Sequence, residues 1–477
     1  MKEQETRGTA DLLRTALAHH QAGRLSEAEQ TYREILAHAP HHADSLHLLG
    51  MVAFQSGRLD DAAELIRKAI AQHQTGAAYH ANLGNVLQAQ DKLDEAEASY
   101  RHALAIKPNL AEVHLNLGNV LKAENKVVEC LVCYRRALSL QPDLAEAAVA
   151  EAMALLLQGD YAAGWKGLEA RWQTREYETP RRAYPQAAWN GKPLESGRLL
   201  IWGEQGIGDE IMFAGLIPDV LSIVRELVLD CDARLRPLFA RSFPGATVLA
   251  GCDPQQAADL GVAAQLPSGS LPGILRGSNA AFGTGVSPYL VVDPLVRERS
   301  RARYADGRKL VGLAWRTKNQ KTGRKRSIEL ALFAALFGLE GVRWVSLQYG
   351  DPDELEHEAR AAGAPLLVDK SVDQLADIDC FAAQVAAMDL VITIDNSTAH
   401  VAGALGVPTW LLLPFAPDWR WLLEREDSPW YPTVRLFRQP RPGDWDAVME
   451  AVRRVLIEGT HKGPRTEGEG FRAPAAF

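Results

Sequence analysis

Residues 389–413, DLVITIDNSTAHVAGALGVPTWLLL, decide how the second half of the chain folds. Leu390 to Ile394 is an apolar, β-branched run, which predicts a buried strand. Asp and Asn end that run, and Ser397 or Thr398 is expected to cap a helix that continues through Ala399 to Leu405. The stretch therefore predicts one β-loop-α-β unit of a parallel sheet.

The two ends of this helix give the unit its direction and its candidate site. Gly406 is expected to close the helix in the left-handed conformation, and Thr409 to Leu413 predicts the next strand. A polar loop after a parallel strand lies at the edge where open sheets bind ligands. The helix start offers unpaired N–H groups, which favour a phosphate, and His400 could reach the same ligand. The alternative is an ordinary capped helix with a packing histidine.

The composition is that of a globular chain. Its 477 residues predict about three domains of roughly 150 residues each. No apolar run approaches about 18 residues and no signal-peptide pattern is present, so we expect no membrane span. A net charge of −8 argues against a surface that coats nucleic acid. The five cysteines favour reduced thiols in the cytoplasm, and the pair Cys130 and Cys133 favours helix packing over a redox or metal role.

An internal repeat occupies the N-terminal part of the chain. Gly50, Gly84 and Gly118 are spaced by 34 residues, and the hexapeptide NLGNVL occurs twice at the same spacing. Small and aromatic residues recur with this period, namely Ala62, Ala96 and Cys130, then Ile66, Tyr100 and Tyr134, then Ala69, Ala103 and Ala137. This pattern resembles the tetratricopeptide repeat, in which each unit is a helical hairpin that must stack on its neighbours.

The resemblance implies a superhelix with a concave groove that holds a peptide or a protein. Asn82, Asn85, Asn116 and Asn119 are expected on the inner helices, where they could bind a peptide backbone or be solvated. The alternative role of the repeats is to solubilise or dimerise the chain, so a homo-oligomer stays open. A less regular capping repeat follows from Leu144 to Trp172.

A glycine-rich loop, residues 203–209 (GEQGIGD), follows the predicted strand Leu199 to Trp202 and precedes a helix predicted over residues 210–224. Its glycines allow a substrate to approach the backbone closely. Asp209, at the helix start, is expected either to cap the helix or to act as a base. The glycine order differs from the dinucleotide fingerprint, although Asp230 lies where a ribose-binding acid would sit, so an NAD site is the lesser alternative.

A basic segment follows the next predicted strand, Lys309 to Trp315. Residues 316–326 hold six basic residues in eleven, which suits a phosphate-bearing ligand, and a solvated charge run is the alternative. Val342 to Leu347 predicts another strand, and a base or ribose could lie against Gln348 at its carboxyl end. Residues 294–308 are charged and weakly apolar, which indicates a hinge.

Two successive Rossmann-like units joined by a hinge describe the GT-B architecture of glycosyltransferases. In detail, about residues 160–457 resemble the heptosyltransferase-like family (glycosyltransferase family 9), in the subgroup fused to tetratricopeptide repeats. The resemblance rests on residues 204–209 (EQGIGD), 312–315 (GLAW), 326–327 (RS), 346–348 (SLQ), 395–400 (DNSTAH), 402–406 (AGALG), 418–421 (DWRW), 430–432 (WYP) and 436–438 (LFR). The fusion is also similar to the O-linked N-acetylglucosamine transferases and to the flagellin glycosyltransferases that attach nonulosonic acids.

The resemblance implies a role for each candidate residue. Asp209 is the expected catalytic base, and the loop with Glu204, Gln205, Gly206 and Gly208 is expected on the acceptor side. The nucleotide-sugar is expected to bind Trp315, Arg316, Lys318, Arg326, Gln348, Asp395, Asn396, Ser397, Thr398 and His400. Asn396 departs from the Asp-Thr that the family often has at this place, which leaves the donor's identity open. The sequence has no acidic metal-binding motif, so metal-independent inversion without a cofactor is expected.

We therefore predict an α + α/β chain, a tetratricopeptide-repeat superhelix followed by a GT-B pair of Rossmann-like domains. The expected domains are residues 1–175 (repeats with the capping repeat), 176–300 (acceptor side), 301–458 (nucleotide-sugar) and 459–477 (disordered tail). The leading hypothesis is a cytoplasmic glycosyltransferase that modifies Ser or Thr of a protein held by the repeats, with flagellin as one candidate. The alternatives are a heptosyltransferase-like enzyme of surface polysaccharide synthesis and a binding scaffold with an inactive transferase half.

Overall fold

The structure is a computed structural model, and it describes residues 2–175, 177, 179–282, 288–319 and 323–461. The chain divides into two compact units, Met1–Gln158 with Gly167–Arg175, and Gly159–Lys166 with Glu176–Phe477. Part of the expected capping repeat, including most of helix α10 (Tyr161–Leu168), thus belongs with the second unit. None of the described helices combines the length and the apolar character that a membrane crossing needs.

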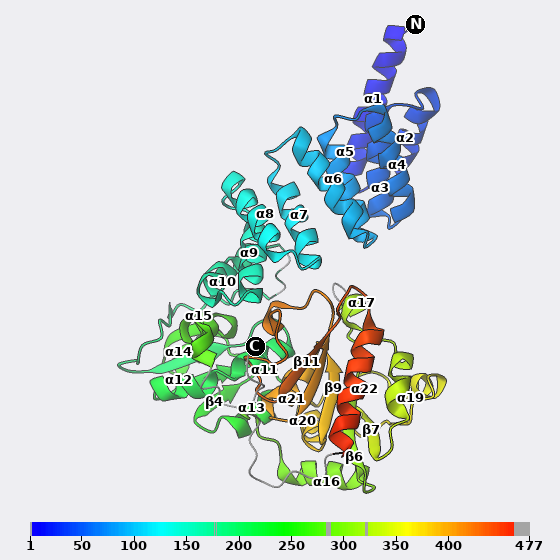
Figure 1. The fold of residues 1–477 in the computed structure, drawn as a ribbon. Coiled ribbons are helices and arrows are strands. Elements are labelled where there is room, and N and C mark those ends of the chain that lie inside the picture. Colours follow the sequence, from blue (N-terminus) through cyan, green and yellow to red (C-terminus); the bar gives the residue numbers. More distant parts are fainter. Residues whose placement is uncertain (1, 176, 178, 283–287, 320–322, 462–477) are drawn as a thin grey trace. The chain divides into compact units, whose positions relative to one another are not determined.

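The first unit is built from helical hairpins (Figure 1). Its helices are α1 (Lys2–Gln21), α2 (Leu25–His38), α3 (Ala43–Gln55), α4 (Leu59–Gln72), α5 (Ala77–Ala89), α6 (Leu93–Ile106), α7 (Ala111–Ala123), α8 (Val127–Leu140), α9 (Ala145–Leu157) and the 3-10 helix η1 (Glu169–Gln173). A Cβ at Gly84 would lie 2.5 Å from Tyr100 Cε1, and one at Gly118 would lie 2.5 Å from Tyr134 Cε1. The period of the repeat therefore reflects an aromatic ring that packs onto a helix where no side chain can stand. Cys130 is buried in the same packing, and all five cysteines are free thiols.

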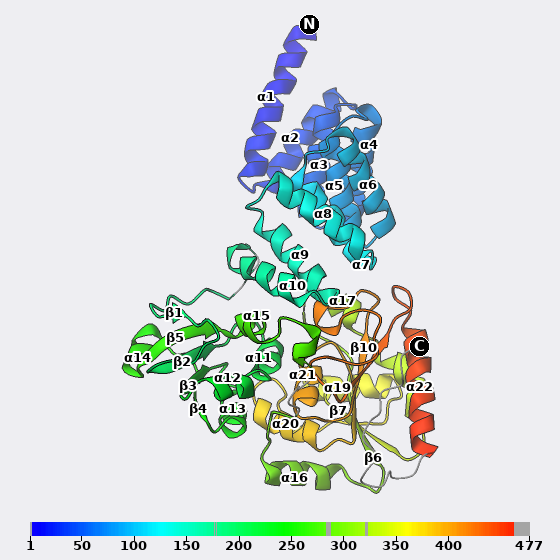
Figure 2. The same cartoon turned by 60° about the vertical axis from the view of Figure 1, so that its left-hand side comes forward.

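The second unit holds two parallel sheets, which Figures 1 and 2 show as two lobes. In the first lobe the order is β1-β5-β2-β3-β4, with β1 (Ala187–Ala188), β2 (Arg198–Trp202), β3 (Leu227–Asp230), β4 (Ala246–Leu249) and β5 (Val262–Pro267). In the second lobe it is β11-β10-β9-β6-β7-β8, with β6 (Lys309–Ala314), β7 (Val342–Ser346), β8 (Leu366–Leu367), β9 (Leu390–Ile394), β10 (Thr409–Leu413) and β11 (Val434–Arg438). The second order reverses direction between β6 and β9, and doubly wound sheets bind ligands at such a switch point.

Helices connect these strands, as parallel pairing requires. In the first lobe they are α11 (Ile207–Ala214), α12 (Ile217–Ile223), α13 (Arg236–Ser242), α14 (Pro254–Asp259), η2 (Ser268–Ser270), α15 (Leu271–Leu275) and η3 (Asn279–Phe282). After α16 (Pro294–Tyr304), the second lobe has α17 (Gly323–Arg326), η4 (Leu330–Phe333), α18 (Ala334–Phe337), α19 (Pro352–Ala361), α20 (Ile378–Ala386), α21 (Ser397–Ala404), η5 (Trp419–Trp421) and α22 (Trp445–His461).

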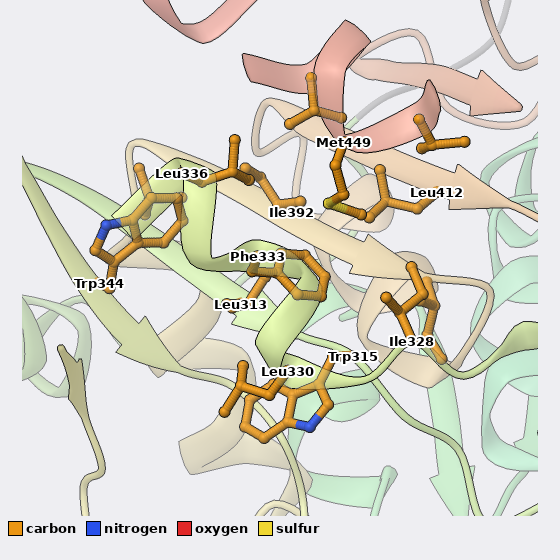
Figure 3. Packing of buried hydrophobic residues seen from close by; sticks show 14 of the residues in the cluster. Leu313, Trp315, Ile328, Leu330, Phe333, Leu336, Trp344, Ile392, Leu412 and Met449 are labelled. Carbon is orange, nitrogen blue, oxygen red and sulfur yellow. The ribbon is translucent and has the colours of Figure 1, made fainter. Parts of the chain in front are cut away.

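The core of the second lobe lies between one face of its sheet and the helices that cover that face (Figure 3). Leu313, Ile392 and Leu412 come from three strands and pack with Phe333 and Met449. These five side chains are almost completely buried. A close-packed layer of this kind holds the strand ends in fixed positions, and with them the loops that follow the strands.

The helix predicted in residues 389–413 is confirmed as α21, and Gly406 closes it with φ +69°. The predicted cap is wrong, because Asn396 rather than Ser397 or Thr398 is the N-cap residue. The Asn396 side chain accepts a hydrogen bond from Thr398 N at 3.0 Å.

Three other predicted segments differ from the structure. The helix expected over 210–224 is broken into α11 and α12, because Pro218 can stand only in the first turn of a new helix. The segment expected as a hinge, 294–308, is mostly helix α16, capped by the Asp293 carboxylate. Helix α22 extends to His461, into the predicted tail, and residues 462–477 lie outside the described part.

Candidate functional site

The strand-end loops of the second lobe bring the two predicted donor segments together. Arg326, at the end of α17, forms an ion pair with Asp395, the residue after β9, with Nη1 and Oδ2 2.8 Å apart. Arg326 also lies 3.4 Å from the Asp418 carboxylate. Asp395 is 4% exposed, and this burial raises its pKa. Both segments therefore lie at the switch-point edge, although residues 320–322 of the basic segment lie outside the described residues.

Asp209 reaches the same edge from the first lobe. Its Oδ2 accepts a hydrogen bond from Gly206 N at 3.3 Å, so it caps α11. Its Oδ1 is paired with the Arg420 guanidinium, which also donates to Asp418 Oδ1 at 2.7 Å. Burial opposes the ionisation of Asp418, but the guanidiniums of Arg420 and Arg326 outweigh it and lower its pKa to about 2. Acidic and basic side chains thus alternate in one row of ion pairs, here called the acid–base chain, that joins the two lobes.

His400 forms part of the wall between the lobes. It is 5% exposed, its Nδ1 lies 2.8 Å from Tyr431 Oη, and its ring stacks on Trp421 at 5.5 Å. Burial first, and then the positive charge of Arg420, lower its pKa to about 3, so the imidazole is neutral at physiological pH. A Cβ at Gly208, from the first lobe, would lie 3.0 Å from His400 Cδ2. The alternative prediction of a packing histidine fits this environment better than an exposed ligand does.

Two predicted donor residues, Trp315 and Arg316, begin the loop after β6, and a third, Gln348 after β7, holds that loop in place. Gln348 is fully buried, and its Oε1 accepts hydrogen bonds from Trp315 N at 3.0 Å and from Arg316 N at 2.9 Å. The Trp315 indole is 1% exposed and donates to Glu358, and Arg316 forms an ion pair with the same carboxylate at 2.6 Å. Gln348 and the Trp315 indole therefore position the loop and do not face a ligand.

The start of α21 carries buried polar atoms beside this loop. Asn396 Nδ2 and Thr398 Oγ1 are buried without a hydrogen-bond partner among the described residues, and Ser397 is partly exposed. On the basic segment, Lys318 N donates to Tyr349 Oη at 2.5 Å, and Lys318 Nζ lies 5.8 Å from the Tyr349 ring centroid. These groups are placed to meet a polar ligand at the strand ends.

The first glycine loop is anchored by one of its predicted residues. Glu204 is 1% exposed and accepts hydrogen bonds from Gly269 N at 2.8 Å and from the Tyr177 hydroxyl. Gln205 is exposed and holds φ +67°, an unusual conformation for a residue with a side chain. Its N–H donates to Thr179 Oγ1 at 3.0 Å. Glu204 therefore fixes the loop from inside, while Gln205 faces outward.

The alternative of an NAD site at Asp230 is wrong. Asp230 is completely buried, and its Oδ1 accepts from Gly251 N at 2.7 Å and Cys252 N at 3.0 Å. Its Oδ2 is paired with Arg182. The carboxylate has no free face for a ribose. Within the described residues, no group of three or more His, Cys, Asp or Glu side chains is placed to hold a metal ion.

Sequence reasoning missed the two residues at the centre of the site, Arg420 and Asp418. The signal was the run of charged residues and tryptophans that follows β10, which marked the family resemblance but received no role. It also missed Glu210, which follows Asp209 in the chain and accepts a hydrogen bond from Asp232 N at 2.9 Å. Burial raises the pKa of Glu210 to about 7.

An aromatic cluster supports the Arg420 turn from within the second unit. Trp165 of α10 lies edge-on to Trp419 at 5.2 Å and to Trp430 at 6.3 Å. Its indole N–H donates to Arg276 O in the first lobe at 2.9 Å. The Arg420 guanidinium lies over the Trp419 ring, 4.4 Å from its centroid. Trp165 thus links α10 to both lobes and, through one aromatic ring, to Arg420.

Comparison with known proteins identifies the first unit. Residues 3–85 match the tetratricopeptide repeat family, and residues 89–125 match a second profile described as TPR repeat. The predicted tetratricopeptide-repeat superhelix is thereby confirmed, followed by a region of parallel sheets. Repeats of this kind bind proteins.

Among proteins of known name, the chain is similar to Protein FlbA of Caulobacter vibrioides. The two are 33% identical over 326 residues, which are 64% of this chain and 54% of FlbA. The chain therefore spans about half the length of this relative. Solved structures with partial likeness include MamA (TM-score 0.31, 21% identity, 32% of this chain and 91% of that one) and pilF of Pseudomonas aeruginosa (TM-score 0.34, 22% identity, 35% and 76%).

Proposed function

We propose that this chain is a glycosyltransferase of GT-B architecture. It transfers a sugar from a nucleotide-sugar to Ser or Thr of a protein that the repeats bind, and flagellin is one candidate acceptor. The five free thiols agree with a cytoplasmic location. The acceptor binds on the lobe with Asp209, and the nucleotide-sugar binds on the lobe with Arg326.

One observation carries this proposal, the acid–base chain that joins Asp209 of the first lobe to Arg326 of the second. It stands at the switch-point edge, where a parallel sheet binds ligands. A carboxylate can take the proton of an acceptor hydroxyl. Guanidiniums fixed nearby can stabilise the charge that develops on a leaving phosphate. Transfer of a sugar between two substrates needs the carboxylate and the guanidiniums at one place.

In the proposed step, the acceptor hydroxyl oxygen bonds to the anomeric carbon while the bond from that carbon to the phosphate oxygen breaks. Asp209 takes the hydroxyl proton, and the phosphate leaves with the bonding electron pair. Attack from the side opposite the phosphate inverts the anomeric centre. Arginine side chains of the second lobe supply the positive charge that stabilises the leaving phosphate.

The acceptor is proposed to lie on the repeats. Asn116 Nδ2 donates to Asn85 Oδ1 at 3.0 Å, and the Tyr100 hydroxyl donates to the same oxygen at 2.7 Å. Asn82 Nδ2 lies 2.8 Å from His47 Nε2. These half-buried amides hold one another in a row along successive repeats, which suits recognition of an extended backbone.

The test uses the full chain with a panel of nucleotide sugars and a flagellin, and it measures intact mass. A mass increase of one sugar that Asp209→Asn reduces at least about 100-fold supports the proposal. The double variant Asn82→Ala, Asn116→Ala is expected to lower protein modification about tenfold while nucleotide binding stays unchanged. Saccharide modification in place of protein modification would favour the heptosyltransferase-like alternative.

The family match of the repeats also supports a second candidate function, a binding scaffold with an inactive transferase half. Titration of the full chain with UDP, GDP, ADP and CMP distinguishes the two. Tight capture of a protein partner without binding of any nucleotide would support the scaffold and end the transferase proposal.

A further inference from the structure

Arg420 is held between carboxylates of different lobes. Its side chain is 13% exposed, and it pairs with Asp209 from the first lobe and Asp418 from its own lobe. In this pair the guanidinium holds Asp209 Oδ1, and Gly206 N donates to Asp209 Oδ2, so both carboxylate oxygens are engaged within the protein. The ion pair between Arg420 and Asp209 therefore conflicts with the role of catalytic base that the proposed function gives to Asp209.

The charges within this set of ion-paired side chains do not balance. Arg420 and Arg326 face three carboxylates, those of Asp209, Asp418 and Asp395. Asp395 and Asp418 each contact Arg326, so these three side chains form a set within the second lobe. Asp209 is the member that comes from the other lobe, and it has a second interaction at the α11 N-terminus. Asp209 is thus the carboxylate that a stronger anion can displace at the least cost.

The turn that carries Arg420 is held in an uncommon conformation. Leu422 and Glu424, which follow it, have φ values of +54° and +52° although neither is glycine. Arg438 donates a hydrogen bond of 2.6 Å to the carbonyl oxygen that precedes Leu422, and the guanidinium of Arg420 rests on the Trp419 ring. Such strain persists only where the surroundings enforce it, so the guanidinium is preorganised at this place.

The Arg420–Asp209 pair lies beside the N-terminal turn of α21. Gly208, the residue before Asp209, packs against His400 of that turn, where an added Cβ would lie 3.0 Å from His400 Cδ2. A phosphate at this edge would meet the helix start and could accept two parallel hydrogen bonds from one guanidinium. The diphosphate of a UDP-, GDP- or ADP-sugar as a whole carries more negative charge than the single carboxylate that it would replace.

We infer that Arg420 changes partners during the reaction, releasing Asp209 when it binds the phosphate of the nucleotide-sugar. This inference rests on the proposed function. Donor binding then frees the base, so the donor binds before the acceptor hydroxyl can be activated. Arg420 is a donor-binding residue in this scheme, and Asp209 is its competitor in the empty site.

The experiment measures nucleotide affinity by calorimetry on the full chain, with whichever of UDP, GDP, ADP and CMP binds the unmodified protein. Asp209→Asn removes the competing charge, so it is expected to tighten nucleotide binding about three- to tenfold while it abolishes transfer. Arg420→Ala is expected to weaken binding at least tenfold, and Arg420→Lys is expected to weaken it less. Arg441→Ala, which removes an exposed pair with Asp444, is the matched control and leaves affinity unchanged.

The outcome that overturns the inference is an Asp209→Asn variant that is folded, as judged by its melting temperature, and binds the nucleotide no more tightly than the unmodified chain. An unchanged affinity in Arg420→Ala would overturn it as well. Either result leaves the proposed function standing if transfer is observed. Failure of the unmodified chain to bind any of the four nucleotides ends both.

Discussion

Replacing Trp165 by Ala tests whether α10 is part of the second unit. The Trp165 side chain is 4% exposed, contacts Trp419 and Trp430, and donates a hydrogen bond to Arg276 O. Truncating a buried tryptophan costs about 3–5 kcal/mol, including about 1 kcal/mol for the lost hydrogen bond. The melting temperature of the second unit is expected to fall by about 6–10 °C. Trp165→Phe keeps most of the ring and is expected to cost about 1–2 kcal/mol.

The assay is differential scanning calorimetry of the full chain, followed by nucleotide titration well below the transition. Trp344→Ala is the matched control, since Trp344 is 1% exposed in the core of the second lobe, on β7. Both variants are expected to lower the melting temperature. Trp165→Ala alone is expected to weaken nucleotide binding about three- to tenfold, because Trp419 then supports Arg420 less well. A fall in melting temperature below about 1 °C for Trp165→Ala, or equal nucleotide affinities in the Trp165→Ala and Trp344→Ala variants, would refute this reasoning.

Three further predictions concern other parts of the chain. Burial raises the pKa of Glu210 from 4.5 to about 7, so the folded state binds more protons between these values. The free energy of unfolding should fall by about 3 kcal/mol as pH rises through that window, and Glu210→Gln should remove this slope in urea titrations. Gly118→Ala should cost about 1–3 kcal/mol, but little when Tyr134→Ala is already present, as a double-mutant cycle can measure. Gly208→Val should collide with His400 and lower transfer more than tenfold while the repeats still melt normally, and unchanged transfer would contradict this packing.

The parts that sequence could predict are those encoded by local pattern. The 34-residue period predicted the helical hairpins, because each repeat glycine faces a large residue 16 positions later, Ile66 in the first case and Tyr100 or Tyr134 in the next two. The run from Leu390 to Leu413 predicted strand, helix and strand, since apolar stretches and Gly406 mark their limits without help from distant residues. The expectation that the basic segment and Asp395 meet one ligand came from the family resemblance, and the carboxyl-edge position of both loops agrees with it.

The parts that sequence could not predict depend on which partner each polar group finds. Gln348 had the right place for a ligand contact, but two backbone N–H groups of the neighbouring loop take its oxygen. Arg420 and Asp209 are 211 positions apart, and their pairing depends on how two lobes meet. Asp230 was a reasonable ribose ligand by position, yet Arg182 reaches it from a segment without a recognisable pattern.

The division of the capping repeat between the two units has a practical consequence. The chain passes from one unit to the other at Gln158, at Lys166 and again at Arg175, so a cut at any of these points separates residues that belong together. Grafting a foreign repeat array onto the part of the chain with the two parallel sheets should therefore succeed only when the splice lies upstream of α9. Chimaeras made there would retain the native last hairpin and exchange only the hairpins that precede it.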